Sequence, residues 1–210
     1  MIYPWGVAVD RVNNVYAADN ENGTVQKWTA ANNTLSTVMS GLSGPCGLAV
    51  DALGDLYTAN YNNSTCGEWL AAINTTTNLP VSGLNNPAGV AVDGSGNVYI
   101  VNAYPVDSVQ EWSPANQRET TAVGSGLYNP LGVAVDGSGN LYIADTQNNA
   151  IKELPRAFVS STLGTEPPAA GSDTLPAFVP AYANLTGPLC TYFQPALADH
   201  HGRHQRGGQF

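Results

Sequence analysis

Basic side chains are scarce in this sequence of 210 residues. Seven Lys and Arg stand against sixteen Asp and Glu, which gives a formal net charge of −9. Nucleic-acid binding depends on a basic patch that displaces counterions from phosphates, and seven scattered cations supply none, so we expect no nucleic-acid partner. Long apolar runs are missing as well. No stretch approaches the roughly 20 residues of a spanning helix, so we expect no membrane span.

Histidine does not occur in residues 1–199, and the three histidines of the chain lie within 200–204. A general base acting near neutral pH would therefore have to be a carboxylate with a shifted pKa. There is no G-x-S-x-G motif for a nucleophile. The three cysteines form no C-x-x-C pair, which argues against a structural zinc site. We predict no catalytic residues, no metal ligands and no cofactor.

The sequence does contain a repeat of about 42 residues, which occurs in four copies. It opens with Pro-x-Gly, runs through an apolar-Ala-Val-Asp segment and reaches a Tyr six residues after that Asp. The copies begin at Pro4, Pro45, Pro87 and Pro130. The shared acidic residues are Asp10, Asp51, Asp93 and Asp136. Repeats of this length are typical of propellers and solenoids.

Each copy carries the pattern of four short strands. "GVAV" indicates a buried strand, "DGSGN" a tight turn, and "NLYIAD" a second strand. "AIKEL" alternates as a third strand, and stretches such as "TTAVG" indicate a weaker fourth one. Four antiparallel strands per repeat make one propeller blade. The sequence therefore predicts an all-β fold, a β-propeller of four-stranded antiparallel blades over residues 1–155.

The pattern P-x-G-V-A-V-D-x-x-G-N-[VL]-Y-[IV]-A-D, followed by "NNxIxxW", resembles the NHL repeat of bacterial β-propellers. The resemblance covers roughly residues 3–155 and implies four NHL-like blades, where NHL propellers usually have six. The first copy departs with "RVNN" in place of "GSGN". Asn60 and Asn102 also replace the acidic residue seen at Asp19 and Asp145.

Four blades in an open arc leave both end blades without a neighbour. We therefore expect a fragment of a larger propeller, or one that another chain completes, rather than a closed four-bladed ring. Residues 156–210 are rich in Pro, Ala and Thr, and we expect them to be partly disordered. No signal peptide precedes Pro4, so either the protein is intracellular or, the alternative we favour, the natural N-terminus lies upstream. The Asn, Thr and Ser content favours an extracytoplasmic or secreted bacterial protein.

Several recurring residues have structural interpretations. A calcium loop needs about six to eight oxygen ligands, more than "DGSGN" offers, so its Asp is predicted to accept backbone N–H groups in a turn. Cys46 and Cys66 are separated by a whole strand, about 9–10 Å. That distance exceeds disulfide reach unless a loop is distorted. The third strands are predicted to pack between blades through Trp28, Trp69, Trp112 and Leu154.

Propeller geometry places the Pro-x-Gly loops and the loops after the second strands at one end of the channel, which we call the channel face. The "DGSGN" turns lie at the other end. Loops that vary on a repeated scaffold are where recognition is encoded, although solvated loops without a ligand are the alternative. Trp5 stands at the channel mouth, where it would floor a pocket or plug the channel. The candidate ligand-binding residues are Trp5, Asp19, Glu21, Tyr61, Tyr104, Asp107, Asp145 and Gln147.

These observations predict a non-catalytic interaction or sensor module that binds a protein, peptide or carbohydrate through its channel-face loops. One alternative is a metal-dependent propeller lyase that resembles streptogramin B lyase. Such lyases rely on histidines and a divalent metal, so metal would raise their stability and activity, whereas a scaffold would be indifferent to EDTA. Another alternative is a structural segment of a larger cell-surface protein.

Overall fold

The computed structural model describes residues 1–155, and the predictions for residues 156–210 lie outside this range. Fifteen strands and one short 3-10 turn, η1 (Thr146–Asn148), make up the described part. The strands are β1 (Pro4–Val9), β2 (Val15–Asp19), β3 (Thr24–Thr29), β4 (Thr34–Met39), β5 (Pro45–Val50), β6 (Leu56–Asn60), β7 (Thr65–Leu70), β8 (Thr75–Asn78), β9 (Pro87–Val92), β10 (Val98–Asn102), β11 (Ser108–Ser113), β12 (Arg118–Val123), β13 (Pro130–Val135), β14 (Leu141–Asp145) and β15 (Ala150–Leu154).

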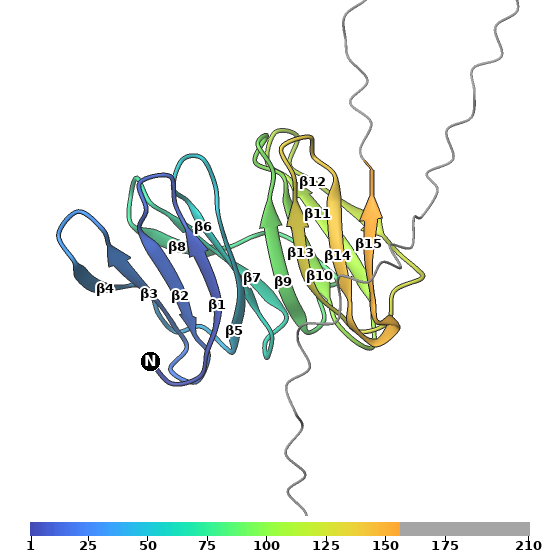
Figure 1. The fold of residues 1–210 in the computed structure, drawn as a ribbon, viewed down its shortest axis with the longest axis horizontal. Coiled ribbons are helices and arrows are strands. Elements are labelled where there is room, and N and C mark those ends of the chain that lie inside the picture. Colours follow the sequence, from blue (N-terminus) through green and yellow to red (C-terminus); the bar gives the residue numbers. More distant parts are fainter. Residues whose placement is uncertain (156–210) are drawn as a thin grey trace, which may run out of the picture.

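The strands form four antiparallel sheets, one for each repeat, which confirms the predicted all-β propeller arrangement. Blade 1 is β1–β4, blade 2 is β5–β8, blade 3 is β9–β12 and blade 4 is β13–β15, each in chain order. Blade 4 has three strands within the described residues, where the other blades have four. In Figure 1 the blades follow one another from blade 1 to blade 4, so the two end blades lie on opposite sides of the molecule.

Successive blades are held together by apolar cores between their sheets. Tyr16, Val25 and Met39 of blade 1 pack against Leu48, Leu56 and Trp69 of blade 2. We call the side of a blade that meets the following blade its downstream face, and the side that meets the preceding blade its upstream face. The same pairing recurs between blades 2 and 3 and between blades 3 and 4. Burial of these faces is the main force that stacks the blades.

The predicted role of the third-strand tryptophans is confirmed where a preceding blade exists. Trp69 belongs to the core between blades 1 and 2, Trp112 packs at the next interface, and Leu154 takes the same place in blade 4. Trp28 lies on the upstream face of blade 1 and is 38% exposed. This exposure is explained by the arrangement of residues 1–155, in which no blade lies against the upstream face of blade 1.

The glycine of Pro-x-Gly lies where neighbouring inner strands touch. A Cβ atom on Gly47 would lie 2.8 Å from the carbonyl oxygen of Ala88, and one on Gly89 would lie 2.8 Å from that of Leu131. Real Cβ atoms do not approach backbone atoms so closely. The repeat therefore needs glycine here because the inner strand of the next blade runs against it.

The recurring Asp starts a turn, as predicted. In blade 3, an oxygen of Asp93 accepts the backbone N–H groups of Ser95 at 2.8 Å and Asn97 at 2.9 Å. Its other oxygen accepts the Asn97 amide at 2.8 Å and the buried Tyr99 hydroxyl at 3.0 Å. Burial alone would raise the pKa of Asp93, but these hydrogen bonds outweigh it and lower the pKa below its ordinary value. The turn is thus tied to the blade core through the repeat's Tyr.

These carboxylates make the stability of the propeller sensitive to acid. Asp10, Asp93 and Asp136 all have lowered pKa values. Their contribution is fully present above the unfolded pKa of about 3.9 and is lost as pH falls through the lower folded pKa. Glu68, whose pKa burial raises, acts in the opposite direction. We expect the urea midpoint, followed by tryptophan fluorescence, to fall below about pH 4. A midpoint that stays constant or rises on acidification would contradict this account.

Candidate functional site

In blades 1, 3 and 4 the channel-face loops are fixed by a side chain at the end of the second strand. In blade 1 an oxygen of Asp19 accepts the N–H of Ile2 at 2.9 Å. The same hydrogen bond recurs in blades 3 and 4. The backbone N–H of Asn85 donates to the side-chain oxygen of Asn102 at 3.0 Å, and the N–H of Tyr128 donates to Asp145 at 2.7 Å. In all three the partners are 17 residues apart. This hydrogen bond holds the loop before Pro-x-Gly against the loop after the second strand.

The carboxylate of Asp145 is used by hydrogen bonds within the fold. It is fully buried and accepts hydrogen bonds from the Asn148 amide and the Lys152 ammonium, both at 2.7 Å. Burial would raise the pKa of Asp145, but Lys152, Asn148 and the Tyr128 N–H outweigh it and hold the pKa below its usual value. Asp19 is likewise buried. We therefore assign these two candidate residues to loop positioning and leave them out of the site.

Three other candidate residues lie together. Tyr61, Tyr104 and Gln147 come from the loops after the second strands of blades 2, 3 and 4, and they line one depression of about 390 Å³. We call it the tyrosine–amide depression. Its complete lining is Tyr61, Asn86, Tyr104, Tyr128, Asn129 and Gln147. All six side chains are uncharged at neutral pH, and Tyr104 and Tyr128 are largely exposed.

Hydrogen bonds between loops hold this lining in place. The Asn86 amide donates to the carbonyl of Tyr104 at 3.0 Å, and the Tyr104 N–H donates to the side-chain oxygen of Asn129 at 3.3 Å. The N–H of Asn129 in turn donates to Asp107 at 2.8 Å. The Gln147 N–H donates to the carbonyl of Tyr128 at 3.0 Å. Loops from adjacent blades therefore brace one another around the depression.

The remaining candidate residues do not line it. Asp107 supports the depression through Asn129. Trp5 lies on β1 of blade 1 and is 69% exposed. Glu21 is exposed in the turn between β2 and β3. The structure thus brings three of the eight candidates into one concave surface and distributes the others.

Three lining residues were not among the candidates, namely Asn86, Tyr128 and Asn129. They precede Pro87 and Pro130 in the loops that lead into the inner strands. Asn86 and Asn129 have φ values of 47° and 48°, and asparagine tolerates this left-handed conformation better than most residues. The repeated Asn-Pro dipeptide was the signal in the sequence that could have indicated them.

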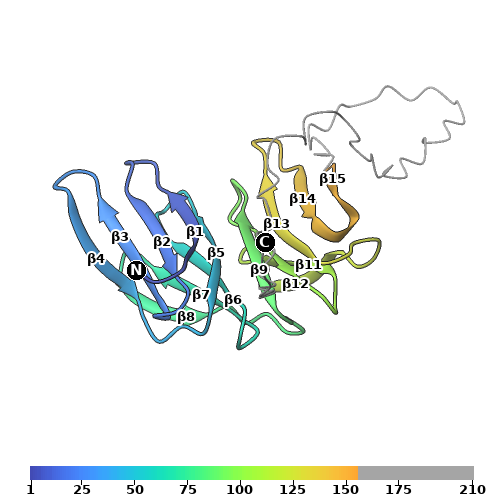
Figure 2. The ribbon, with the colours of Figure 1, turned by 60° about the horizontal axis from the view of Figure 1, so that its bottom comes forward.

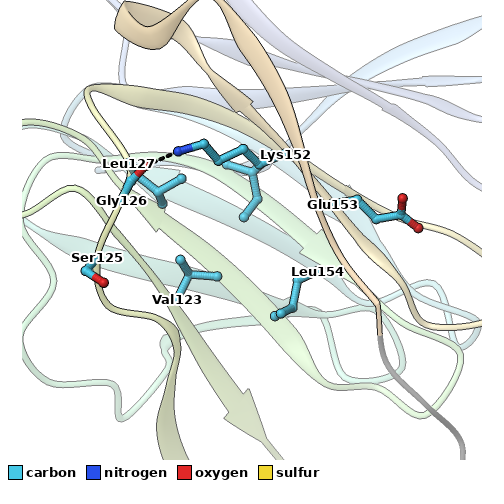
Figure 3. A pocket seen from close by; sticks show the side chains of 8 residues that line it. Val123, Ser125, Gly126, Leu127, Lys152, Glu153 and Leu154 are labelled. Atoms are coloured by element: carbon cyan, nitrogen blue, oxygen red, sulfur yellow. Dashed lines mark hydrogen bonds between the residues drawn. The ribbon is translucent and has the colours of Figure 1, made fainter. Parts of the chain in front are cut away.

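A second hollow, of about 280 Å³, lies between blades 3 and 4 (Figure 3). Val123, Leu127, Ile143 and Leu154 supply its apolar lining, and the Lys152 ammonium donates to the carbonyl of Gly126 at its rim. Between blades 2 and 3 the corresponding region is bridged by Glu119 of the fourth strand, β12, which accepts hydrogen bonds from Ser82. The hollow thus marks the place next to β15 where the other blades carry a fourth strand.

In residues 1–155, no three His, Cys, Asp or Glu side chains gather as a metal site requires. Over the same range, no helix is long and apolar enough to cross a membrane. Cys46 and Cys66 are both free and buried, and burial raises the pKa of the Cys66 thiol to about 12.

Comparison with known proteins agrees with the repeats and the fold. Residues 1–28 and 127–154 match the NHL repeat family model. No curated protein sequence matches the chain. Among solved structures, streptogramin B lyase is similar with a TM-score of 0.63 and 14% identity, over 72% of this chain and 51% of that chain. This chain therefore spans about half the length of that lyase.

Two further structures extend the comparison. A putative gluconolactonase is similar with a TM-score of 0.61 and 18% identity, over 74% of this chain and 60% of that one. A chain of the nidogen–laminin complex is similar with a TM-score of 0.54 and 18% identity, over 72% of this chain and 75% of that one. At these identities the structural likeness extends to the fold alone. Together with the family match over residues 1–28 and 127–154 and the four repeats, it supports an NHL-repeat β-propeller.

Proposed function

We propose that this chain is a non-catalytic interaction module that binds a protein, peptide or carbohydrate partner through its channel face, outside the cytoplasm. The observation that carries the proposal is the convergence of three tyrosines and three amide side chains from blades 2, 3 and 4 on one depression. Recognition on a repeated scaffold is encoded in such loops. The depression joins loops that only the propeller fold brings together.

The chemistry of the lining favours a neutral carbohydrate. Tyrosine offers an apolar ring face beside a hydroxyl that forms hydrogen bonds. Asn and Gln amides both donate and accept, which matches the hydroxyl groups of a sugar. A charged partner would find no opposite charge among the six lining residues. The volume of about 390 Å³ falls within the range of small-ligand sites.

Two other functions have an observation in their favour. The fold likeness to streptogramin B lyase supports a metal-dependent lyase. The half-length match to that lyase supports a structural segment of a larger cell-surface protein. Neither function accounts for the three tyrosines and three amides at the channel face, which is why we favour the interaction module.

Calorimetric titration with a panel of neutral oligosaccharides (cellohexaose, chitohexaose, maltohexaose and xylohexaose) tests the proposal. We expect at least one to bind, and Tyr104→Ala and Tyr128→Ala each to weaken that binding about tenfold or more, as loss of an aromatic contact does. Tyr3→Ala is the matched control, because Tyr3 is an exposed tyrosine that does not line the depression. Unchanged affinity in both site variants, or no binding by any sugar, would contradict the carbohydrate site.

A further inference from the structure

Both ends of the blade stack present apolar faces that are buried everywhere else. On the upstream face of blade 1, Val7 is 66% exposed. The corresponding residues of blades 2 and 3, Leu48 and Val90, are 8% and 6% exposed. Val9 and Trp28 extend the same uncovered surface. Blade 1 thus offers a complete upstream face, and no blade of the described residues lies against it.

Blade 4 presents the complementary half. Ile151 on its downstream face is 40% exposed, whereas Val25, Cys66 and Val109 at the same repeat position are fully buried. Ala134 is exposed and Tyr142 is half-buried beside it. These residues repeat the downstream pattern that contacts the next blade at the three internal interfaces.

The glycine of the fourth repeat, Gly132, also indicates that the downstream face of blade 4 lacks a neighbour within the described residues. Gly47 and Gly89 leave room for the inner strand of the following blade. A Cβ atom on Gly132 would meet only the Cβ of Ala144, at an ordinary 3.5 Å. Within the described residues, no inner strand runs against Gly132, so the close approach that this position permits is not used inside the chain.

Within residues 1–155, the two end faces do not meet. The inner strands pack in the order β1, β5, β9, β13, and Figures 1 and 2 show blades 1 and 4 at opposite ends of the stack. Each copy of the chain carries the upstream half of a blade interface and, on the three described strands of blade 4, the part of the downstream half that those strands form. A second copy therefore supplies a partner for each exposed end. The part of one copy that aligns with streptogramin B lyase covers 51% of that chain, so two such parts together have about its length.

We propose that two copies associate head to tail into a closed ring of eight blades. The upstream face of blade 1, with Val7, Val9 and Trp28, stacks on the downstream face of blade 4 of the second copy, and the reverse contact closes the ring. Gly132 of each copy then faces the partner's first inner strand. A heterologous contact of this kind closes when its rotation completes a ring. The inference goes beyond the proposed function and does not depend on it.

Light scattering coupled to size-exclusion chromatography gives the first test. We expect the full chain to have twice its monomer mass of 21.9 kDa. Val7→Glu and Ile151→Glu each place a charge in both interfaces and should yield monomers with an unchanged circular dichroism spectrum. Gly132→Ala should also yield a folded monomer, because its methyl group would overlap with the partner's inner strand. This variant tests the interface if a charged variant fails to fold. Ile73→Glu, an exposed apolar residue on the β7–β8 turn, should remain a dimer.

Mixing the two charged variants distinguishes head-to-tail pairing from pairing through one face. In the mixture, the intact downstream face of Val7→Glu meets the intact upstream face of Ile151→Glu, so a one-to-one dimer should reappear. A monomeric wild-type chain, a dimer that survives Ile151→Glu, or open polymers that grow with concentration would each overturn the proposal. Carbohydrate binding is measured separately in the monomeric variants, so its failure is not confused with failure of the ring.

Discussion

Gly89→Ala is expected to destabilise the propeller by about 3 kcal/mol or more, at the upper end for overpacked positions. The new methyl group would lie 2.8 Å from the carbonyl oxygen of Leu131, with the Gly132 Cα and the Val133 nitrogen close behind. All three are backbone atoms of β13, so no side chain can turn aside. Blades 3 and 4 must separate to admit the methyl group, which opens the core between them.

Gly132→Ala is the matched control, because it makes the same substitution at the same repeat position without an inner strand in front of it. It should keep the circular dichroism spectrum and the cooperative urea unfolding of the parent chain. Urea titrations of both variants, made in the monomeric Val7→Glu background, compare the intrachain effect alone. Equal losses of unfolding free energy would show that the glycine serves its own strand and not the contact between blades.

Asp93→Ala is expected to cost about 2–3 kcal/mol, since it leaves several donors without their acceptor. The backbone N–H groups of Ser95 and Asn97 lose their partner, and so does the Asn97 amide. The Tyr99 hydroxyl also loses its 3.0 Å acceptor within the core between blades 3 and 4. The change therefore loosens both the turn and the blade interface.

Asp136→Ala removes the same four contacts in blade 4. There Tyr142 is only half-buried, so water can replace part of what is lost, and the loss should be less than half that of Asp93→Ala. Urea unfolding at pH 7, in the monomeric Val7→Glu background, measures both. A larger loss for Asp136→Ala than for Asp93→Ala would contradict the link between the turn and the buried tyrosine.

The fold was predictable because every repeat has the same local sequence pattern of turns and buried strands. Asp93 and its equivalents start turns, "GVAV" segments are buried, and Trp69 and Trp112 recur at one blade position because blades pack there. The glycine of Pro-x-Gly was also visible as a repeated feature. Its physical reason was not, since the contact of Gly89 with Leu131 joins residues of different blades.

The site was predictable only in part. Variation among the loops indicated Tyr61, Tyr104 and Gln147, which the structure places around one depression. The same variation indicated Asp19 and Asp145, which are buried. An acidic residue at the end of a strand looks alike in sequence whether it faces a ligand or a backbone N–H of a loop 17 residues away. Only the three-dimensional path of that loop separates the two roles.

Hydrogen–deuterium exchange tests most directly the claim that the tyrosine–amide depression is the binding surface. The chain is measured alone and with each oligosaccharide of the panel. The account predicts slower exchange in peptides that cover residues 103–107 and 126–129 on the channel face, with no change in the turn at 93–97 on the opposite face. Slower exchange confined to the turns, or unchanged exchange at the channel-face loops in the presence of a sugar that binds, would contradict it.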